Sequence, residues 1–275
     1  MPLTPYACEN CGFWQRYFAP PPDCPVCTDV RNDLPEDGWS WLRAEDAEGR
    51  YGGEVRRLSD GFYEARTRPA LGLAGAGWLT VRDGVTVAFE AAPYYSAAML
   101  SEIDALGGIQ RLGASHVHGY GALWQLQDRF APEVLAIHKD DLQLTKAFRV
   151  SAPYDDVYDL GPGIRCHHVG GHYEGQAVAY DEEARRLFSG DVFKVDQDED
   201  GNAVAISTHK AFHKNIPMTH AELRRYREVI APLDFAAVCT PFEHAPDVDR
   251  ALCLAVLDRA LSEPPSVTHY RVSEL

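Results

Sequence analysis

Five residues in four separate segments carry side chains suited to metal-assisted chemistry. His116 and His118 are one residue apart, so on an extended segment their rings point the same way and can grip one ion. His172 lies in a glycine-rich turn, Asp191 ends an apolar run, and His244 follows a second apolar run. Imidazole nitrogens and carboxylate oxygens are ligands of zinc and iron. Each segment follows a predicted strand, where α/β proteins gather functional groups on loops, so we predict one site built from all four.

A second group consists of cysteines near the start of the chain. Cys8 and Cys11 form one CxxC pair, and Cys24 and Cys27 form another. Two such knuckles facing each other make a tetrahedral sulfur site for zinc or iron. About 40 residues cannot hold a core alone, so bound metal would supply folding energy. We predict a structural zinc site of the zinc-ribbon kind; because CxxCG followed by CPxC also resembles rubredoxin-like modules, an electron-transferring iron is the alternative.

Length and charge limit the possible organisation and partners. The chain has 275 residues, 26 Lys and Arg against 41 Asp and Glu, a net charge of −15 and a pI near 5.1. Such acidity disfavours nucleic acid and anionic membrane surfaces, so we expect a small-molecule substrate, with a homo-oligomer left open. No apolar run reaches the ~18–20 residues of a membrane helix. Residues 1–6 lack the pattern of a signal peptide, and we expect a cytoplasmic protein.

Local patterns predict strands and helices in alternation. A boundary near residue 45 would separate a small module, residues 1–45, from a larger domain, residues 46–275. In the larger domain the expected strands and hairpins cover residues 78–82 with 84–89, 109–115, 134–138, 177–180 with 186–189, and 235–239. The expected helices cover residues 96–106, 122–130 and 246–261, and another begins at Thr219 with Glu222 completing a capping box. This order predicts an α+β domain with mixed sheets covered by helices.

From about residue 75 to the end of the sequence, the chain resembles the metallo-β-lactamase superfamily. That family's H-x-H-x-D-H motif is matched by residues 116–121, its Gly-His turn by Gly171-His172, and its strand-ending Asp by the Phe-Ser-Gly-Asp run at 188–191. Its last histidine is matched by His244. The resemblance implies an αββα sandwich of two mixed β-sheets covered by helices.

The departures from the family motif concern the second metal position. Tyr120 and Gly121 stand where the family has Asp and His, and Phe89-Glu90 stands where a strand-ending Asp is usual. By the resemblance, the first position is formed by His116, His118 and His172 with Asp191 at its edge, and the second keeps only Asp191 and His244. Two protein ligands are few for a tight site. We therefore predict one ion, zinc or iron.

A single ion held in this way suits hydrolysis. A metal-bound water with its pKa lowered towards ~7 would attack a small ester, thioester or lactone. Asp191 would hold that water or accept its proton, Tyr120 would donate a hydrogen bond to a substrate oxyanion, and His244 would orient substrate or water. The stretch around His209 and His213, with its lysines, is expected to lie over the entrance and to attract an acidic substrate.

Two other functions fit the same residues. The superfamily includes iron oxygenases and flavodiiron proteins, so His116, His172 and Asp191 could form a facial triad for iron, with the cysteine module as an electron relay. Alternatively, the loss of two ligands marks a degenerate site on a binding protein that is not an enzyme. Bound iron and colour would indicate the first, and an empty larger domain the second.

Overall fold

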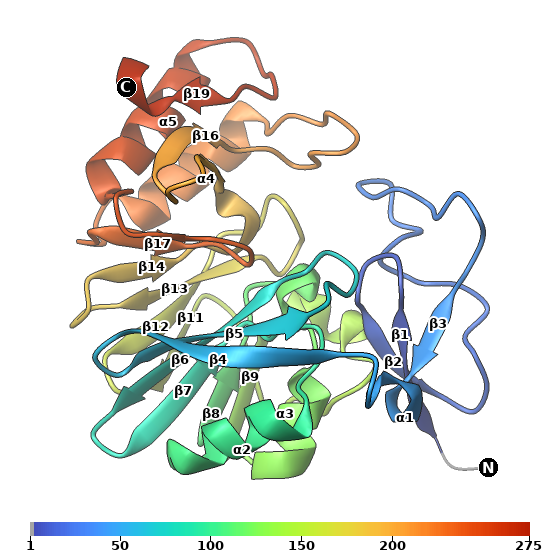
Figure 1. The fold of residues 1–275 in the computed structure, drawn as a ribbon. Coiled ribbons are helices and arrows are strands. Elements are labelled where there is room, and N and C mark those ends of the chain that lie inside the picture. Colours follow the sequence, from blue (N-terminus) through green and yellow to red (C-terminus); the bar gives the residue numbers. More distant parts are fainter. Residues whose placement is uncertain (1–2) are drawn as a thin grey trace.

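The computed structural model describes residues 3–275 and contains two large β-sheets packed face to face (Figure 1). The first sheet has seven strands in the order β10-β9-β8-β7-β6-β5-β4. The strand bounds are β4 Gly52–Ser59, β5 Phe62–Arg68, β6 Ala76–Arg82, β7 Val85–Phe89, β8 Arg111–Gly113, β9 Val134–His138 and β10 Ala152–Tyr154. β4 to β7 are antiparallel and β7 to β10 are parallel, so the sheet is mixed, as predicted.

The second sheet has six strands in the order β11-β12-β13-β14-β17-β18. Their bounds are β11 Val157–Gly161, β12 Ile164–His168, β13 Ala177–Asp181, β14 Arg186–Phe188, β17 Ala237–Cys239 and β18 His244–Ala245. Only the β14–β17 pairing is parallel. A smaller sheet, β15 (Lys194–Gln197), β16 (Ala203–Ser207) and β19 (Tyr270–Arg271), adjoins the C-terminal helices.

Helices cover the outer faces of both sheets, which confirms the αββα arrangement. α2 (Ala97–Ala105) and α3 (Leu123–Phe130) share an apolar cluster with the first sheet, and α4 (His220–Ile230) and α5 (Arg250–Ser262) share another with the second. A third cluster lies between the sheets. Residues 3–275 also contain the 3-10 helices η1 Val117–Gly119, η2 Lys139–Leu144, η3 Gly190–Val192 and η4 Val272–Glu274.

Alternation along the central strands explains these three clusters. In β6, Leu79 belongs to the helix-side cluster and Trp78 to the cluster between the sheets. In β13, Val178 faces the helices and Ala177 and Ala179 face the opposite sheet. Because successive strand residues point to opposite faces, a strand covered on both faces is apolar at nearly every position.

Most expected turns and caps are present. Asp83 and Gly84 have φ values of 52° and 76°, the pair of positive values that a tight hairpin between β6 and β7 requires. Thr219 and Glu222 form the predicted capping box of α4. The last helix was predicted to start at residue 246, but α5 begins at Arg250, where the Asp249 side chain caps it through the Leu252 amide.

The N-terminal module packs beside the first sheet, in dark blue in Figure 1. It consists of β1 (Thr4–Cys8), β2 (Trp14–Tyr17), β3 (Trp41–Arg43) and α1 (Ala44–Ala47), with the strands in the order β2-β1-β3. Its buried side chains belong to the same cluster as those of α2 and α3. Trp14 Nε1 donates a hydrogen bond to the carbonyl of Pro93 at 2.7 Å. The module is therefore docked on the larger domain through a continuous core.

Two expectations concern the chain ends and membranes. The part of the signal-peptide prediction that falls on Met1 and Pro2 lies outside the described residues. Within residues 3–275, none of the helices has the length and apolar character needed to cross a bilayer.

Candidate functional site

Loops from both sheets bring four predicted residues together at one edge of the sandwich. His116 and His118 follow β8 of the first sheet, with His118 in the η1 turn. His172 lies between β12 and β13, and Asp191 lies in η3 directly after β14, both from the second sheet. One ligand atom from each of the four lies within 4.8 Å of the others. These four of the five predicted ligands thus come together at the point where the two sheets meet.

The donor atoms converge on one carboxylate oxygen. Asp191 Oδ2 lies 3.2 Å from His116 Nε2, 3.0 Å from His118 Nδ1 and 3.2 Å from His172 Nε2. His172 Nε2 and His118 Nδ1 are 3.5 Å apart. Three imidazole nitrogens and one carboxylate, all aimed at a common point, form a donor set that fits zinc or iron.

A buried chain of hydrogen bonds supports His116 from behind. Ser115 Oγ lies 2.8 Å from His116 Nδ1, and the Ser115 amide donates to both carboxyl oxygens of Glu90 at 3.3 Å. When Nε2 faces the metal position, Nδ1 carries the proton and donates to Ser115, which fixes the tautomer and the ring plane. Glu90 also explains a glycine in the motif, since a Cβ at Gly119 would lie 1.5 Å from Glu90 Oε2.

Helix α4 holds the turn that carries His172 through two hydrogen bonds of Tyr226. Tyr226 Oη accepts from the His172 amide and donates to the carbonyl of Gly170, each at 3.1 Å. Gly171 has a φ of +86°, and a Cβ there would lie 2.5 Å from Tyr226 Oη. The glycine-rich spacing seen in the sequence therefore serves both a left-handed backbone and a close approach to a tyrosine.

Burial holds His116 and His118 in the neutral form that binds metal. Burial lowers the pKa of His116 to about 3, although Asp191 opposes this shift, and burial also lowers the pKa of His118. Burial would raise the pKa of Asp191, but the three imidazoles lower it well below its ordinary value. The neutral histidines and ionised aspartate are the protonation states of metal ligands.

A cavity of about 270 Å³ opens onto this cluster. Its walls are mostly apolar, and three of the four donors, all but His116, reach its surface. The other lining residues are Arg31, Asn32, Leu73, Phe193, Lys194, His209, Ala211, Phe212, His213, Thr240, Phe242 and Glu243. A concave, largely apolar space with a few polar groups is typical of a small-molecule site.

Four cavity or support residues were missed or unassigned in the sequence. Arg31 and Asn32 come from the N-terminal module, where no local pattern links them to the histidines. Glu243 lines the cavity and accepts from the Thr240 hydroxyl at 2.5 Å, and burial raises its pKa. Its position next to His244 was the signal that could have found it. Glu90 stands at the position noted for a strand-ending Asp, and burial raises its pKa to about 8.

Two predicted roles are not supported by the positions of their residues. His244 lies in β18 and packs against Phe62 and Trp78, with ring centroids at 5.6 and 6.3 Å, and it is not part of the ligand group formed within residues 3–275. Tyr120 is buried in the core with its ring edge against Phe148, and it is absent from the cavity lining within those residues. We therefore correct the metal and substrate roles of His244 and the oxyanion role of Tyr120.

The predicted entrance loop does border the cavity, but its lysines point elsewhere. His209, Ala211, Phe212 and His213 line the wall. Lys210 pairs with Glu222 of α4, and Lys214 pairs with Asp33 of the N-terminal module. The lysine charges are thus used to hold the loop rather than to attract an acidic substrate.

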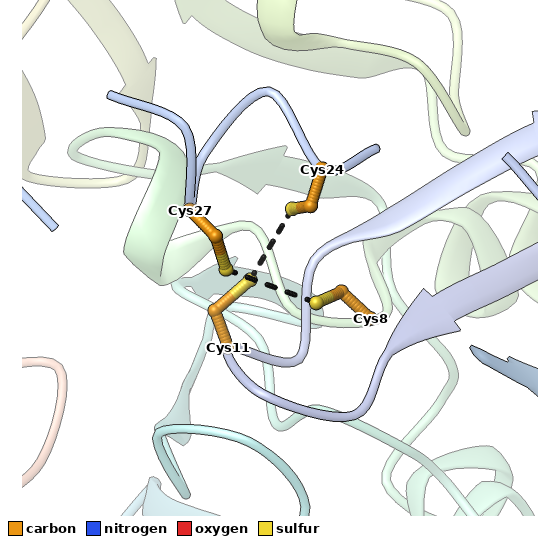
Figure 2. Close-up of side chains that lie close together, drawn as sticks. All are labelled: Cys8, Cys11, Cys24 and Cys27. Atoms are coloured by element: carbon orange, nitrogen blue, oxygen red, sulfur yellow. Dashed lines mark hydrogen bonds between the residues drawn. The ribbon is translucent and has the colours of Figure 1, made fainter. Parts of the chain in front are cut away.

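The four module cysteines form the second predicted ligand group. Figure 2 shows their sulfur atoms turned toward one another, with Cys8 and Cys27 3.8 Å apart and Cys11 and Cys24 3.6 Å apart. All four are free thiols. A tetrahedral zinc site with bonds of ~2.3 Å has sulfur–sulfur edges of ~3.8 Å, so the geometry fits a metal site with four cysteine ligands. The side-chain Nδ2 of Asn10 donates to Cys27 Sγ at 3.3 Å, which supports a thiolate there.

A third cluster, His138, Asp140 and His168, does not suit a metal. The two rings are stacked with centroids 3.8 Å apart and planes inclined by 8°. A metal lies close to the plane of each imidazole that binds it, and two parallel planes do not meet at a shared ion. His168 Nε2 already faces the carbonyl of Glu174 at 2.8 Å, and His138 Nδ1 accepts from the Asp140 amide at 3.3 Å.

Comparison with known proteins agrees with this architecture. No family model matches the chain. Uncharacterized protein YmaE of Bacillus subtilis (strain 168) is 24% identical over 251 residues, covering 86% of this chain and 88% of that protein. Among solved structures, VMB-1 is similar with a TM-score of 0.57 and 15% identity, covering 77% of this chain and 97% of its own.

Two further structures share this fold. The metallo-β-lactamase FIM-1 from Pseudomonas aeruginosa, in its mono-zinc form, has a TM-score of 0.54 at 10% identity over 77% of this chain and 97% of its own. Rubredoxin oxygen:oxidoreductase from Desulfovibrio gigas has a TM-score of 0.53 at 14% identity over 76% and 61%. The chain therefore has the metallo-β-lactamase fold, with an N-terminal four-cysteine module that fits a zinc ribbon.

Proposed function

We propose that this protein is a metal-dependent hydrolase of a small ester, thioester or lactone. The observation that carries the proposal is the convergence of three imidazoles and one carboxylate beside a cavity of small-molecule size. The ligand set supports one ion, because Tyr120 and His244 are turned away from the position of a second. The mono-zinc form of FIM-1 provides a structural parallel. Zinc is the metal proposed, with iron as the alternative.

Each residue of the proposed active site has a separate role in hydrolysis. When bound, zinc would supply a nucleophile near neutral pH, because it lowers the pKa of a coordinated water to ~7. His116, His118 and His172 would hold the ion, and the ionised carboxylate of Asp191 at its edge would hold the attacking water by a hydrogen bond. Glu243 lines the cavity, where burial raises the pKa of its carboxyl, so this residue would be the one to exchange a proton with the leaving group.

The cavity walls favour a substrate with an apolar part. Leu73, Phe193, Phe212 and Phe242 line the space, and its size limits the substrate to a small molecule. Phosphodiester hydrolysis profits from two ions that clamp the attacking and leaving oxygens, so a single-ion site in an acidic chain is poorly suited to nucleic acid.

The test is hydrolysis of a panel of small esters, thioesters and lactones by the zinc-loaded protein and two histidine variants. His118→Ala should lose activity by about 10³-fold or more, because the variant loses a metal ligand. His220→Ala is the matched control, since His220 Nε2 binds the carbonyl of Glu263 away from the cavity. Absence of turnover on the whole panel by the zinc-loaded wild type, or equal turnover in both variants, would contradict the proposal.

A mononuclear iron oxidoreductase is a second candidate, favoured by the nearness of the two ligand groups. Cys11 of the N-terminal module and His118 of the His/Asp site line the same small cavity, so the two ligand groups are close neighbours. In this reading the module relays electrons to iron held by His116, His172 and Asp191. Iron at both sites, with the visible colour of an iron–sulfur centre, would favour this function; colourless protein with zinc at both sites excludes it. A chain with zinc at the cysteines alone would instead indicate a binding protein.

A further inference from the structure

The N-terminal module reaches a metal ligand of the larger domain through Arg31. The Arg31 Nη1 donates to the main-chain carbonyl of His172 at 2.7 Å. Its guanidinium lies over the Tyr173 ring, with Cζ 3.9 Å from the centroid, and its Nη2 approaches the Glu174 carboxylate at 3.3 Å. One side chain therefore contacts three consecutive residues of the turn that presents the third imidazole.

The position of Arg31 is set in turn by the second cysteine knuckle. Asp29 binds the guanidinium with both carboxylate oxygens, at 2.6 and 2.7 Å. The Asp29 amide donates to the carbonyl of Val26 at 3.2 Å, and the Asn32 side chain donates to the same carbonyl at 2.9 Å. Val26 lies between the ligands Cys24 and Cys27, so the loop that carries Arg31 is wrapped onto the knuckle itself.

The turn around His172 needs such support. Gly170 and Gly171 both have positive φ values, and the His172 main chain is held by Tyr226 at its amide and by Arg31 at its carbonyl. Asn32 adds a hydrogen bond to Tyr173 Oη at 2.9 Å. Displacing the turn by a fraction of an ångström would move the His172 nitrogen away from the common point that it shares with His116 and His118.

We infer that Arg31 is a positioning residue that couples the four-cysteine site to the His/Asp site, so that metal in the module strengthens metal binding at the catalytic centre. The inference rests on the metal site proposed above. The coupling is reciprocal by linkage, so a metal at His172 must strengthen metal binding by the cysteines by the same factor. Supporting groups of this kind typically change metal affinity by about 10–100-fold.

The experiment measures cobalt binding to the full chain, because thiolate and imidazole sites give separate absorption bands. Titrations compare wild type with Arg31→Ala, Arg31→Lys and Arg16→Ala. Arg16 is the matched control: it also joins the module to the larger domain, through the carbonyl of Ala147 at 2.7 Å and Asp128 at 2.6 Å, but contacts no ligand turn. Thermal unfolding of each variant separates local effects from misfolding.

In Arg31→Ala we expect the affinity of the His/Asp site to fall about 10–100-fold with a changed imidazole band, while Arg16→Ala stays within about threefold. Arg31→Lys should retain part of the metal affinity of the His/Asp site, because an ammonium group can reach the His172 carbonyl but cannot form the bidentate pair with Asp29. Replacing Cys24 by Ser should weaken the His/Asp site in the same direction.

Equal affinities in Arg31→Ala and Arg16→Ala would overturn the coupling while leaving the proposed metal site intact. If wild type binds no cobalt at the His/Asp site, the proposed function itself fails and the coupling fails with it. The two failures are thus distinguished by the wild-type titration.

Discussion

Ser115→Ala offers a direct test of how the site is organised. Ser115 Oγ lies 2.8 Å from His116 Nδ1, and both side chains are buried. Removing the hydroxyl leaves a buried imidazole N–H without its acceptor, which costs about 1–3 kcal/mol. Part of that cost falls on the metal-bound state, because the ring loses the bond that fixes its tautomer and orientation. We therefore expect zinc affinity at this site to fall about 10–100-fold, equivalent to about 1.4–2.8 kcal/mol.

The assay is competition for zinc with a chromophoric chelator, with cobalt absorption used to assign the loss to the imidazole site. Ser96→Ala is the matched control, because Ser96 caps α2 through the Met99 amide, away from the metal site. That variant should lose about 1 kcal/mol of folding stability and no zinc affinity. Unchanged zinc affinity in Ser115→Ala, alongside a stability loss equal to that of Ser96→Ala, would refute the reasoning.

Three more predictions concern stability. Burial raises the pKa of Asp141 from 3.8 to about 6, so the folded chain holds a proton that the unfolded chain releases, and stability falls as the pH rises through this range. Measured by urea unfolding, the free energy of unfolding of Asp141→Asn should equal that of wild type near pH 4 and exceed it by up to about 3 kcal/mol above pH 6.5. A difference that is the same at all pH values would contradict this prediction. Cys24→Ser should contain one metal ion fewer per chain, measured by elemental analysis, and its free energy of unfolding should fall by about 3 kcal/mol or more. An unchanged metal content would disprove the four-cysteine site. Tyr226→Phe should lower the free energy of unfolding by about 1–3 kcal/mol and weaken metal binding at His172. Tyr180→Phe, which removes the hydrogen bond of an exposed hydroxyl, should have little effect. Equal losses in the two variants would contradict a supporting role of Tyr226.

Much of the site was readable from the sequence because the information is local. The two CxxC pairs, the His116–His118 spacing, the glycine turn before His172 and the strand ending at Asp191 each specify a ligand and the loop that presents it. The hairpins and the capping box follow from residue types within a few positions. The order of strands and helices predicts mixed sheets covered by helices, and the resemblance to the metallo-β-lactamase superfamily implies that two such sheets pack together.

Only the tertiary structure decided which neighbouring side chains face the site. On β18 and the turn before it, His244 faces Phe62 while Glu243 faces the cavity, and a shift of one residue reverses such an assignment. Tyr120 follows the η1 turn, which directs its ring into the core against Phe148. Arg31 is 141 residues from His172 in the sequence. No local pattern encodes contacts at that separation, because they depend on how the module docks, and docking is determined by the shared core.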